Sequence, residues 1–232
     1  MRKNGEPFIT AKNLTIAYGA RVIVSNIDFT VNRGDIFVIM GGSGSGKSTI
    51  MKTLIGLKQP DSGVVMVGNT DLWHTDSEKR NKILETFGIS FQSGALFSSM
   101  TVGENVALPM ELQTQMSPQQ IAHRVTEKLA LVGLADARDL YPTEISGGMV
   151  KRAALARALA LNPEIVFFDE PSAGLDPIRS KQLDDLIVQI NRAGTTIVMV
   201  THELDSIMSI ATNSIYLDAT THSITGRGAP RK

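Results

Sequence analysis

One short segment constrains the fold more than any other part of the sequence. Residues 41–49 have the sequence Gly-Gly-Ser-Gly-Ser-Gly-Lys-Ser-Thr and match the pattern G-x-x-x-x-G-K-[ST]. The apolar residues 36–40 before it predict a strand buried on both faces, and residues 48–57 after it predict a helix with one apolar side. Strand, glycine-rich loop and helix form the context in which this pattern wraps backbone N–H groups around phosphate. A flexible Gly/Ser linker needs neither Lys-Ser at a fixed place nor an adjoining strand, so we expect a nucleoside triphosphate site.

The residues of this loop predict how a triphosphate is held. Glycines let the backbone turn its N–H groups inward around an anion, and the helix N-terminus adds a partial charge of about +0.5. Lys47 is expected to reach the β- and γ-phosphates, and the Ser48 hydroxyl is expected to bind Mg²⁺. The loop residues expected to contact the nucleotide are Gly41, Gly42, Ser43, Gly44, Ser45, Gly46, Lys47, Ser48 and Thr49.

The composition limits the class of protein. With 232 residues, the chain is long enough for one large domain or for a core with an inserted subdomain. Lys and Arg together number 23, as do Asp and Glu, so the net charge of zero argues against a nucleic-acid protein that depends on a positive field. The absence of cysteine fits a reducing compartment, and residues 1–7 contain no secretory h-region. No apolar run approaches the roughly 20 residues of a membrane helix, so we expect a cytoplasmic protein whose membrane role comes through a partner.

The remaining chain predicts alternating strands and helices. Stretches in which apolar and polar residues nearly alternate, at 8–18 and 22–31, predict two antiparallel strands joined by a turn. Further short strands are expected at 64–67, 87–91, 165–168, 196–200 and 214–217, and helices at 150–161, at 178–192 and between 203 and about 211. The basic, glycine-rich tail after Leu217 is expected to be frayed.

Residues 93–146 differ in character from the rest. Proline is expected to interrupt this stretch at Pro109, Pro118 and Pro142, and helical periodicity is present over residues 121–132. We therefore predict a single α/β domain over residues 1–232. It consists of a P-loop NTPase (RecA-like) core with an N-terminal antiparallel β subdomain, about 1–92 and 150–232, and an inserted α-helical subdomain, about 93–149.

Two acidic residues follow the apolar strand predicted at 165–168. An acid at the C-terminal end of a buried strand lies at the edge where open α/β sheets bind ligands. Asp169 is expected to hold Mg²⁺ through water, and Glu170 is placed to act as general base on the attacking water. Two solvated acids at a strand end are the ordinary alternative, and the phosphate-binding loop upstream favours the catalytic interpretation.

A second anion site is predicted at Ser146-Gly147-Gly148, before the helix of residues 150–161. Ser146 is a preferred N-cap residue, and the two glycines leave backbone N–H groups uncovered at a helix N-terminus. A plain capped helix explains the serine but not the two glycines. This site is remote in sequence from residues 41–49. A second phosphate site at this position is explained if it binds the nucleotide of a second copy of the chain.

These motifs, taken in order, resemble those of the nucleotide-binding subunits of ABC transporters, and the resemblance covers essentially the whole chain. The matching positions are Tyr18 for the aromatic residue that stacks on adenine, 41–48 for Walker A, Gln92 for the Q-loop, 145–149 for the LSGGQ helix, 165–170 for Walker B, 172–176 for the D-loop and His202 for the switch histidine. One short match could arise by chance, whereas an ordered set is specific. Met149 departs from the usual Gln and Ile145 from Leu, but the residues that would touch phosphate are intact.

The resemblance implies a head-to-tail dimer with two ATP molecules at its interface, each between the Walker motifs of one chain and residues 146–148 of the other. It also implies that Gln92 senses the γ-phosphate and Mg²⁺ at a hinge to the helical subdomain, and that Asp176 connects the two sites. The catalytic residues are then Glu170, His202 and Gln92, the further ATP contacts are Tyr18, Ser146, Gly147, Gly148 and Asp176, and the Mg²⁺ ligands are Ser48, Gln92 and Asp169. Taken alone, the Gln, the His and the Tyr each have an ordinary structural explanation.

A narrower resemblance, carried by residues 91–97, 104–110, 146–149 and 201–207, is to the ATPases of the Mla/Mce lipid-transport systems. It implies a subunit peripheral to the cytoplasmic face of the inner (cell) membrane that drives phospholipid movement between bacterial membranes. The implied partners are a second copy of the chain, an integral-membrane permease and an Mce-domain substrate-binding protein, without nucleic acid. Two alternatives stay open: an importer or exporter ATPase for another substrate, and a soluble ABC-type ATPase that acts on nucleic acid.

Overall fold

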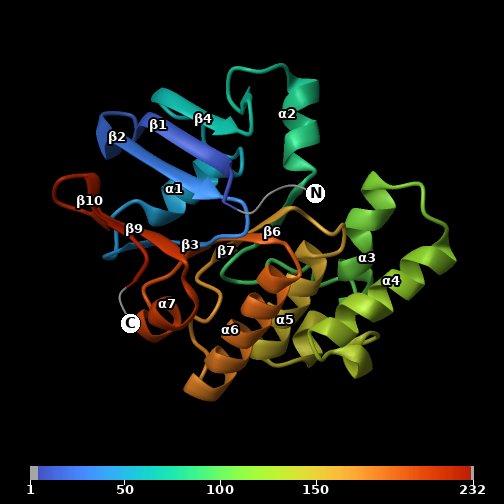
Figure 1. Cartoon of the computed structure of the whole chain (residues 1–232). Coiled ribbons are helices and arrows are strands. Elements are labelled where there is room, and N and C mark those ends of the chain that lie inside the picture. The colour runs from blue at the N-terminus through green and yellow to red at the C-terminus, as the bar shows by residue number, and fades with distance from the viewer. Residues whose placement is uncertain (1–4, 231–232) are drawn as a thin grey trace.

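A computed structural model describes residues 5–230 and contains two β-sheets with helices packed around them (Figure 1). The smaller sheet has four antiparallel strands in the order β2-β1-β4-β5. Its strands are β1 Pro7–Tyr18, β2 Arg21–Asn32, β4 Ser62–Val67 and β5 Thr70–Asp71. The pairing of β1 with β2, in which Tyr18 lies opposite Arg21 beside the turn, confirms the predicted antiparallel pair.

The larger sheet has six strands in the order β10-β9-β3-β8-β7-β6. The strands are β3 Ile36–Gly41, β6 Phe87–Ser90, β7 Ile165–Asp169, β8 Thr196–Val200, β9 Asn213–Asp218 and β10 Ser223–Gly228. All but β10 run parallel, and β3, β7 and β8 are nearly continuous buried apolar runs, as a parallel sheet covered on both faces requires. Because parallel strands end at the same edge, the residues that follow β3, β6, β7 and β8 meet there.

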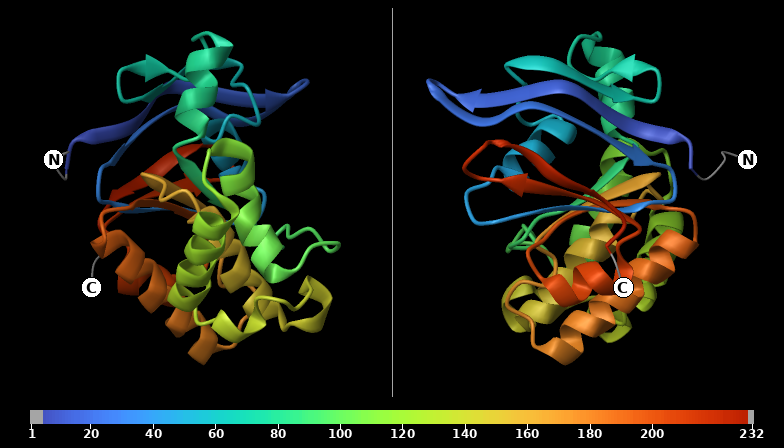
Figure 2. Two further views of the ribbon diagram at one scale, coloured as in Figure 1. Left: turned by 90° about the vertical axis from the view of Figure 1, so that its right-hand side faces the viewer. Right: turned by 60° about the vertical axis from the view of Figure 1, so that its left-hand side comes forward.

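Successive residues of β3 point into two different cores, so the sheet separates the molecule into layers (Figure 2). The helices that cover the sheet are α1 Lys47–Leu54, α5 Gly147–Ala158, α6 Pro177–Arg192 and α7 Leu204–Ile210. Phe37 and Ile39 pack in the core that includes the four-stranded sheet and α1, whereas Ile36 and Val38 pack in the core that includes α5, α6 and α7. The helices α1 and α5 therefore lie on opposite faces of the large sheet.

Helices without strands make up the stretch between β6 and α5. They are α3 Val102–Gln113, α4 Pro118–Leu131 and the short 3₁₀ turns Ala135–Ala137 and Pro142–Glu144. Reciprocal hydrogen bonds cap α3 through Thr101 and Glu104 and cap α4 through Ser117 and Gln120. Among the described residues, no helix has the length and apolar character needed to cross a membrane.

The expected interruption at Pro109 is wrong, because this residue lies inside α3. The helix continues since its buried residues Val102, Val106 and Met110 pack in the core and a capping box fixes its start, so tertiary packing outweighs the missing N–H. Pro118 instead begins α4, at the first helical position where a missing N–H costs little.

Two further expectations about helix ends are corrected. The first helix ends at Leu54 rather than Leu57, because Gly56 takes the left-handed conformation and Leu57 N–H bonds back to the carbonyl of Lys52. The helix expected to begin at Val150 begins at Gly147, because the Ser146 side chain accepts a hydrogen bond from Met149 N.

The sequence did not predict helix α2, Ser77–Leu84, or strand β10. Helix α2 has no buried residue and hence no apolar periodicity, although Asp76 caps it by accepting a hydrogen bond from Lys79 N. The tail expected to be frayed forms β10, which pairs with β9 and is fastened by a 2.7 Å hydrogen bond from Ser214 Oγ to the carbonyl of Gly228.

Candidate functional site

The glycine-rich loop connects β3 to α1 and is closed in by two neighbouring strands. Gly46 has a φ of 100°, in the left-handed region, and a Cβ there would lie 2.8 Å from Cγ2 of Ile23 in β2. A Cβ on Gly41 would lie 2.6 Å from the carbonyl oxygen of Leu217 in β9. The loop therefore approaches both strands because these residues are glycine. No side chain of the described residues caps α1 and its first turn holds no acid, so the positive end of its dipole faces the loop.

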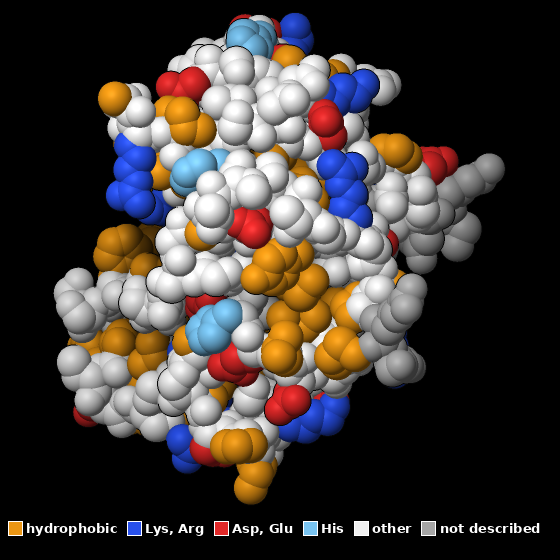
Figure 3. Space-filling model, turned by 90° about the vertical axis from the view of Figure 1, so that its left-hand side faces the viewer, with side chains coloured by type: hydrophobic (Ala, Val, Ile, Leu, Met, Phe, Trp, Pro, Cys, Tyr) orange, Lys and Arg blue, Asp and Glu red, His pale blue; other side chains and the backbone are white. Residues whose placement is uncertain are grey.

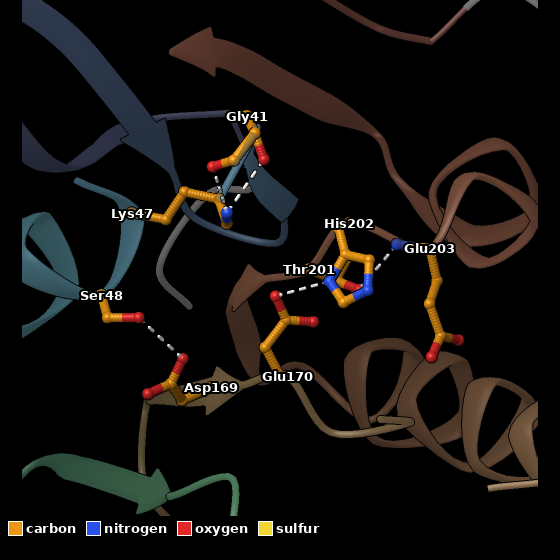
Figure 4. A network of polar contacts seen from close by, with 9 residues as sticks. Gly41, Lys47, Ser48, Asp169, Glu170, Thr201, His202 and Glu203 are labelled. Carbon is orange, nitrogen blue, oxygen red and sulfur yellow. Dashed lines mark hydrogen bonds and ion pairs between the residues drawn. The ribbon is translucent and has the colours of Figure 1, made fainter. Parts of the chain in front are cut away.

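Lys47 and Ser48 begin α1 and direct their polar groups toward the loop and toward β7 (Figure 4). Lys47 Nζ donates hydrogen bonds to the carbonyl oxygens of Gly41 at 2.9 Å and of Gly42 at 3.0 Å. Ser48 Oγ donates to Oδ1 of Asp169, the last residue of β7, across 3.4 Å. Burial raises the pKa of Asp169, and the hydrogen bond from Ser48 opposes that shift. A cation and a carboxylate–hydroxyl pair are thus brought together at one edge of the sheet.

Glu170 and His202 form a second pair at the same edge (Figure 4). Glu170 has a φ of 48°, uncommon for a residue other than glycine, and its N–H donates to the carbonyl of Val200 at 2.9 Å. Its Oε1 lies 2.9 Å from Nδ1 of His202, whereas Oε2 is buried without a hydrogen-bond partner among the described residues. A buried carboxylate oxygen left unpaired is costly, so Oε2 is a ready acceptor for an O–H group.

Gln92 and Tyr18 lie at the borders of this region. Gln92 is exposed and follows β6 by two residues, at the edge where β7 ends, because Ser90 of β6 lies opposite Phe168 of β7. Tyr18 ends β1 with half of its surface exposed, and Lys58 Nζ lies 5.2 Å from the centre of its ring. The edge of the large sheet thus brings together residues 41–49, Gln92, Asp169, Glu170 and His202, with Tyr18 at the end of the neighbouring sheet.

The segment Ser146-Gly147-Gly148 is not brought to the glycine-rich loop. It opens α5, which packs on the opposite face of the sheet from α1. A Cβ on Gly147 would have nothing within 4 Å, and one on Gly148 would lie 3.5 Å from Cδ2 of Leu175. The described chain therefore leaves open space beside Gly147, whereas Leu175 lies close to Gly148.

Asp176 makes hydrogen bonds with neighbouring residues of its own chain. Its carboxylate caps α6 by accepting hydrogen bonds from the N–H groups of Ile178 at 3.1 Å and Arg179 at 3.0 Å.

Lys151 was not among the predicted site residues. It lies on α5, and its Nζ donates a hydrogen bond to the carbonyl oxygen of Ala173. This bond ties α5 to the loop that leads to Asp176, and no local pattern could have indicated it.

The architecture and the site together define a class. A parallel sheet covered on both faces, a glycine-rich loop entering α1 with its lysine on the loop, and acids at the end of β7 are the parts of a phosphate-loop nucleotide-binding domain. The segment of helices between β6 and α5 and the open N-terminus of α5 distinguish this chain from a minimal member of that class.

The chain belongs to the ABC transporter family, whose profile matches residues 24–173. Among curated relatives, the probable ribonucleotide transport ATP-binding protein mkl of Mycobacterium tuberculosis is 41% identical over 206 residues, which is 88% of this chain and 57% of the relative. The intermembrane phospholipid transport system ATP-binding protein MlaF of Haemophilus influenzae is 40% identical over 204 residues, 88% of this chain and 77% of the relative. The chain thus spans little more than half of the mycobacterial relative.

A solved structure supports the same assignment. The dimeric ATP-binding cassette MJ0796 in a post-hydrolysis state, bound to ADP and Pi, is 30% identical and covers 97% of this chain and 99% of its own, with a TM-score of 0.87. The predicted fold class and the predicted family are confirmed, and the chain is an ATP-binding cassette.

Proposed function

We propose that this chain hydrolyses ATP as the energy-supplying subunit of a membrane transporter for phospholipids. The observation that carries the proposal is the set of polar contacts at one sheet edge: Lys47 on the loop, Ser48 with Asp169, and Glu170 with His202. Each partner in these contacts has the chemistry that phosphoryl transfer to water requires.

The residues present fit ATP and Mg²⁺. Lys47 bonds two carbonyl oxygens of the loop, so its ammonium already lies where the loop surrounds an anion, and Tyr18 offers an exposed ring for the base. The oxygens of Ser48, Asp169 and Gln92 suit a hard cation. Among the described residues, no three acidic, histidine or cysteine side chains are placed to hold a metal ion together. Mg²⁺ that is bound with phosphate needs only one or two carboxylates from the protein. Bound Mg²⁺ would neutralise charge on the phosphate oxygens.

Glu170 is proposed as the general base. Its unpaired Oε2 accepts the proton of the attacking water, while its Oε1 is held by His202 Nδ1. The strained backbone of Glu170 and its bond to β8 fix the carboxylate before the reaction, so little reorganisation is needed. The exposed His202 ring is available to donate to the γ-phosphate or to the water.

We further propose that the working unit is a head-to-tail dimer. An added Cβ on Gly147 would meet nothing within 4 Å, α5 packs on the far side of the sheet from α1, and the structural relative with ADP and Pi is a dimer. In this arrangement Ser146, Gly147 and Gly148 of one copy complete the triphosphate site of the other, and Asp176, beyond its capping role, lies near the partner.

The transporter partners are proposed from the resemblance to the lipid-transport ATPases. The helical segment of about residues 93–149 is proposed as the subdomain that contacts an integral-membrane permease, on the inner face of the cell membrane, together with an Mce-domain substrate-binding protein. Phospholipid is proposed because residues 91–97, 104–110, 146–149 and 201–207 resemble lipid-transport ATPases and a relative named for phospholipid transport is 40% identical over 77% of its length. Nucleic acid is not favoured: the net charge is zero, and on the face shown in Figure 3 basic and acidic side chains are interspersed.

The hydrolysis mechanism is tested with Glu170→Gln, which keeps the size of the side chain but not its basicity. ATP turnover is expected to fall by about 10²-fold or more while ATP still binds, so a dimer accumulates in ATP and is detected by light scattering. Glu85→Gln, an exposed acid just after α2, is the matched control and should leave turnover unchanged. Normal turnover in Glu170→Gln would remove this residue from its proposed role.

The transport assignment needs a separate measurement. The chain should co-purify from membranes with a permease and an Mce-domain protein, and ATP should drive transfer of labelled phospholipid between vesicles containing that complex and acceptor vesicles. Transfer that is equally fast with Glu170→Gln in the complex, or recovery of the chain only as a soluble protein bound to nucleic acid, would contradict this assignment without touching the ATPase chemistry.

A further inference from the structure

A buried polar contact joins two helices beside the proposed catalytic pair. Ser206 Oγ, on α7, donates a 2.9 Å hydrogen bond to Oδ2 of Asp184, on α6. Both side chains are almost fully enclosed, with exposures of 5% for Asp184 and 2% for Ser206. The two residues also line a hollow between α6 and α7, so the contact joins the helices and is largely hidden from solvent.

An aspartate is an unexpected residue at this position of α6. Its neighbours on the buried face of the helix are Leu183, Ile187 and Ile190. Burial raises the pKa of Asp184, and the hydrogen bond from Ser206 opposes that shift. A buried carboxylate weakens packing stability compared with an apolar residue of similar size, so such groups are best explained by the geometry they impose.

The helix that Ser206 belongs to is weakly fixed by other means. Helix α7 has seven residues, no side-chain hydrogen bond at its N-cap Glu203, and only Ile207 and Ile210 as buried apolar anchors. A second contact to α6 comes from Ser180 Oγ, which donates to Oε2 of Glu203 across 3.3 Å. Two hydrogen bonds, one donated by α7 and one donated by α6, therefore join α6 to the start of α7.

The start of α7 determines the place of His202. The ring of His202 is 66% exposed, so packing does little to orient it, and its partner is Oε1 of Glu170 at 2.9 Å. The next residue, Glu203, donates its N–H to Oγ1 of the buried Thr201, so His202 lies in a short hydrogen-bonded segment between β8 and α7 (Figure 4). Shifts of about 1 Å in a catalytic group can cost on the order of 10²-fold in rate.

We propose that Asp184 and Ser206 are positioning residues, which hold α7 in register on α6 so that His202 stays within hydrogen-bonding distance of Glu170. This inference rests on the proposed catalytic roles of Glu170 and His202. It assigns to a contact outside the nucleotide site an effect on turnover rather than on nucleotide binding.

The test is steady-state ATPase kinetics on the full chain, or on its transporter complex, with a set of matched variants. Ser206→Ala is expected to lower kcat by about five- to tenfold with KM for ATP changed less than twofold. Ser206→Thr and Asp184→Asn keep the hydroxyl donor and an oxygen acceptor, so both should retain most of kcat. Ser209→Ala, which removes an exposed serine from the same helix, is the control and should behave as wild type.

A double-variant cycle separates positioning from general destabilisation. If Ser206 acts through His202, adding Ser206→Ala to His202→Ala should lower kcat no further. The apolar pair Asp184→Leu with Ser206→Ala should melt at or above the wild-type temperature and still show the reduced kcat, which covers the case in which Ser206→Ala alone folds poorly.

Three results would overturn the proposal: an unchanged kcat in folded Ser206→Ala and in the pair Asp184→Leu with Ser206→Ala, a loss of kcat in Ser206→Ala that adds fully to that of His202→Ala, or a loss that follows the melting temperature across the set. A normal kcat in His202→Ala itself would show that the proposed role of His202 is wrong, which is distinct from failure of the Asp184–Ser206 contact alone.

Discussion

The chain presents two glycine-rich helix N-termini that differ in what surrounds them. At the start of α1, added Cβ atoms on Gly41 and Gly46 would collide with β9 and β2, and Lys47 spans the loop through two hydrogen bonds. At the start of α5, an added Cβ on Gly147 would meet nothing, and this residue does not have a positive φ. The first site, residues 41–49, is shaped by contacts within its own chain, and we call it the closed site. At the second site, no contact within the described chain requires glycine at position 147.

The two sites therefore differ in the reason why glycine is required. In a helix, glycine is less stable than alanine by about 0.5–1 kcal/mol, so Gly147 weakens the isolated chain. No contact within the described chain explains Gly147, and in the proposed dimer a triphosphate bound by the second copy would approach this residue from outside.

Lys47→Ala should have the largest effect on the closed site. It removes the ammonium that bonds Gly41 and Gly42, so ATP turnover should fall by about 10²–10³-fold. ATP binding measured by calorimetry should weaken in parallel, while the melting temperature of the nucleotide-free protein changes little. Lys82→Ala, on the exposed helix α2, is the control. Turnover near the wild-type rate in Lys47→Ala would contradict the central assignment of the loop.

Paired alanine variants of the two glycines should give opposite effects on stability. Gly46→Ala should lower the free energy of unfolding by about 1–3 kcal/mol, because it forces a side chain into a left-handed conformation 2.8 Å from Ile23. Gly147→Ala should raise it by about 0.5–1 kcal/mol and yet reduce ATPase activity and ATP-dependent dimerisation. Urea unfolding and light scattering measure the two properties. Full activity in the stabilised Gly147→Ala protein would show that no partner molecule approaches this residue closely.

Much of the closed site could be predicted because its parts are local. The strand before residue 41, the lysine after the glycines and the acids after residue 168 each lie within a few positions of an apolar run that predicts a strand. Topology then brings these strand ends to one edge. Helix α2 and β10 were missed or expected to be frayed because neither has an apolar face, and their stability comes from caps and pairing instead.

The hydrogen bonds that join the helices and loops around the site could not be predicted in this way. Lys151 with Ala173, and Asp184 with Ser206, are each separated by 22 positions, and their meeting depends on how α5, α6 and α7 pack. Asp176 illustrates a different limit. A cap is the ordinary role of Asp before Pro at a helix start, and the resemblance directed attention to a role across the dimer.

Lys151→Met should have an intermediate effect and should link the two regions. The change keeps the aliphatic length but removes the hydrogen bond from Nζ to Ala173, which joins α5 to the loop before α6. Burial lowers the pKa of Lys151, and the negative charges of Glu203 and Glu170 oppose that shift. The ammonium of Lys151 therefore also interacts electrostatically with Glu170, the proposed base. We expect kcat to fall by about three- to tenfold with KM for ATP unchanged. Lys181→Met, on the exposed side of α6, is the control, and a raised KM with normal kcat would count against this link.

Tyr18 should show the smallest effect, since it lies at the margin of the closed site and is half exposed. An aromatic ring stacked on a base contributes about 0.5–1.5 kcal/mol, so Tyr18→Ala should raise the Kd for ATP by about two- to tenfold, while Tyr18→Phe, which keeps the ring, should have little effect. Lys58, whose Nζ lies 5.2 Å from the ring centre, supports one face of the ring, so Lys58→Ala should weaken binding less than Tyr18→Ala. Tyr216→Ala removes another exposed tyrosine, from β9, and is the control. Equal affinity in Tyr18→Ala and Tyr18→Phe would place the base elsewhere and confine the closed site to the triphosphate.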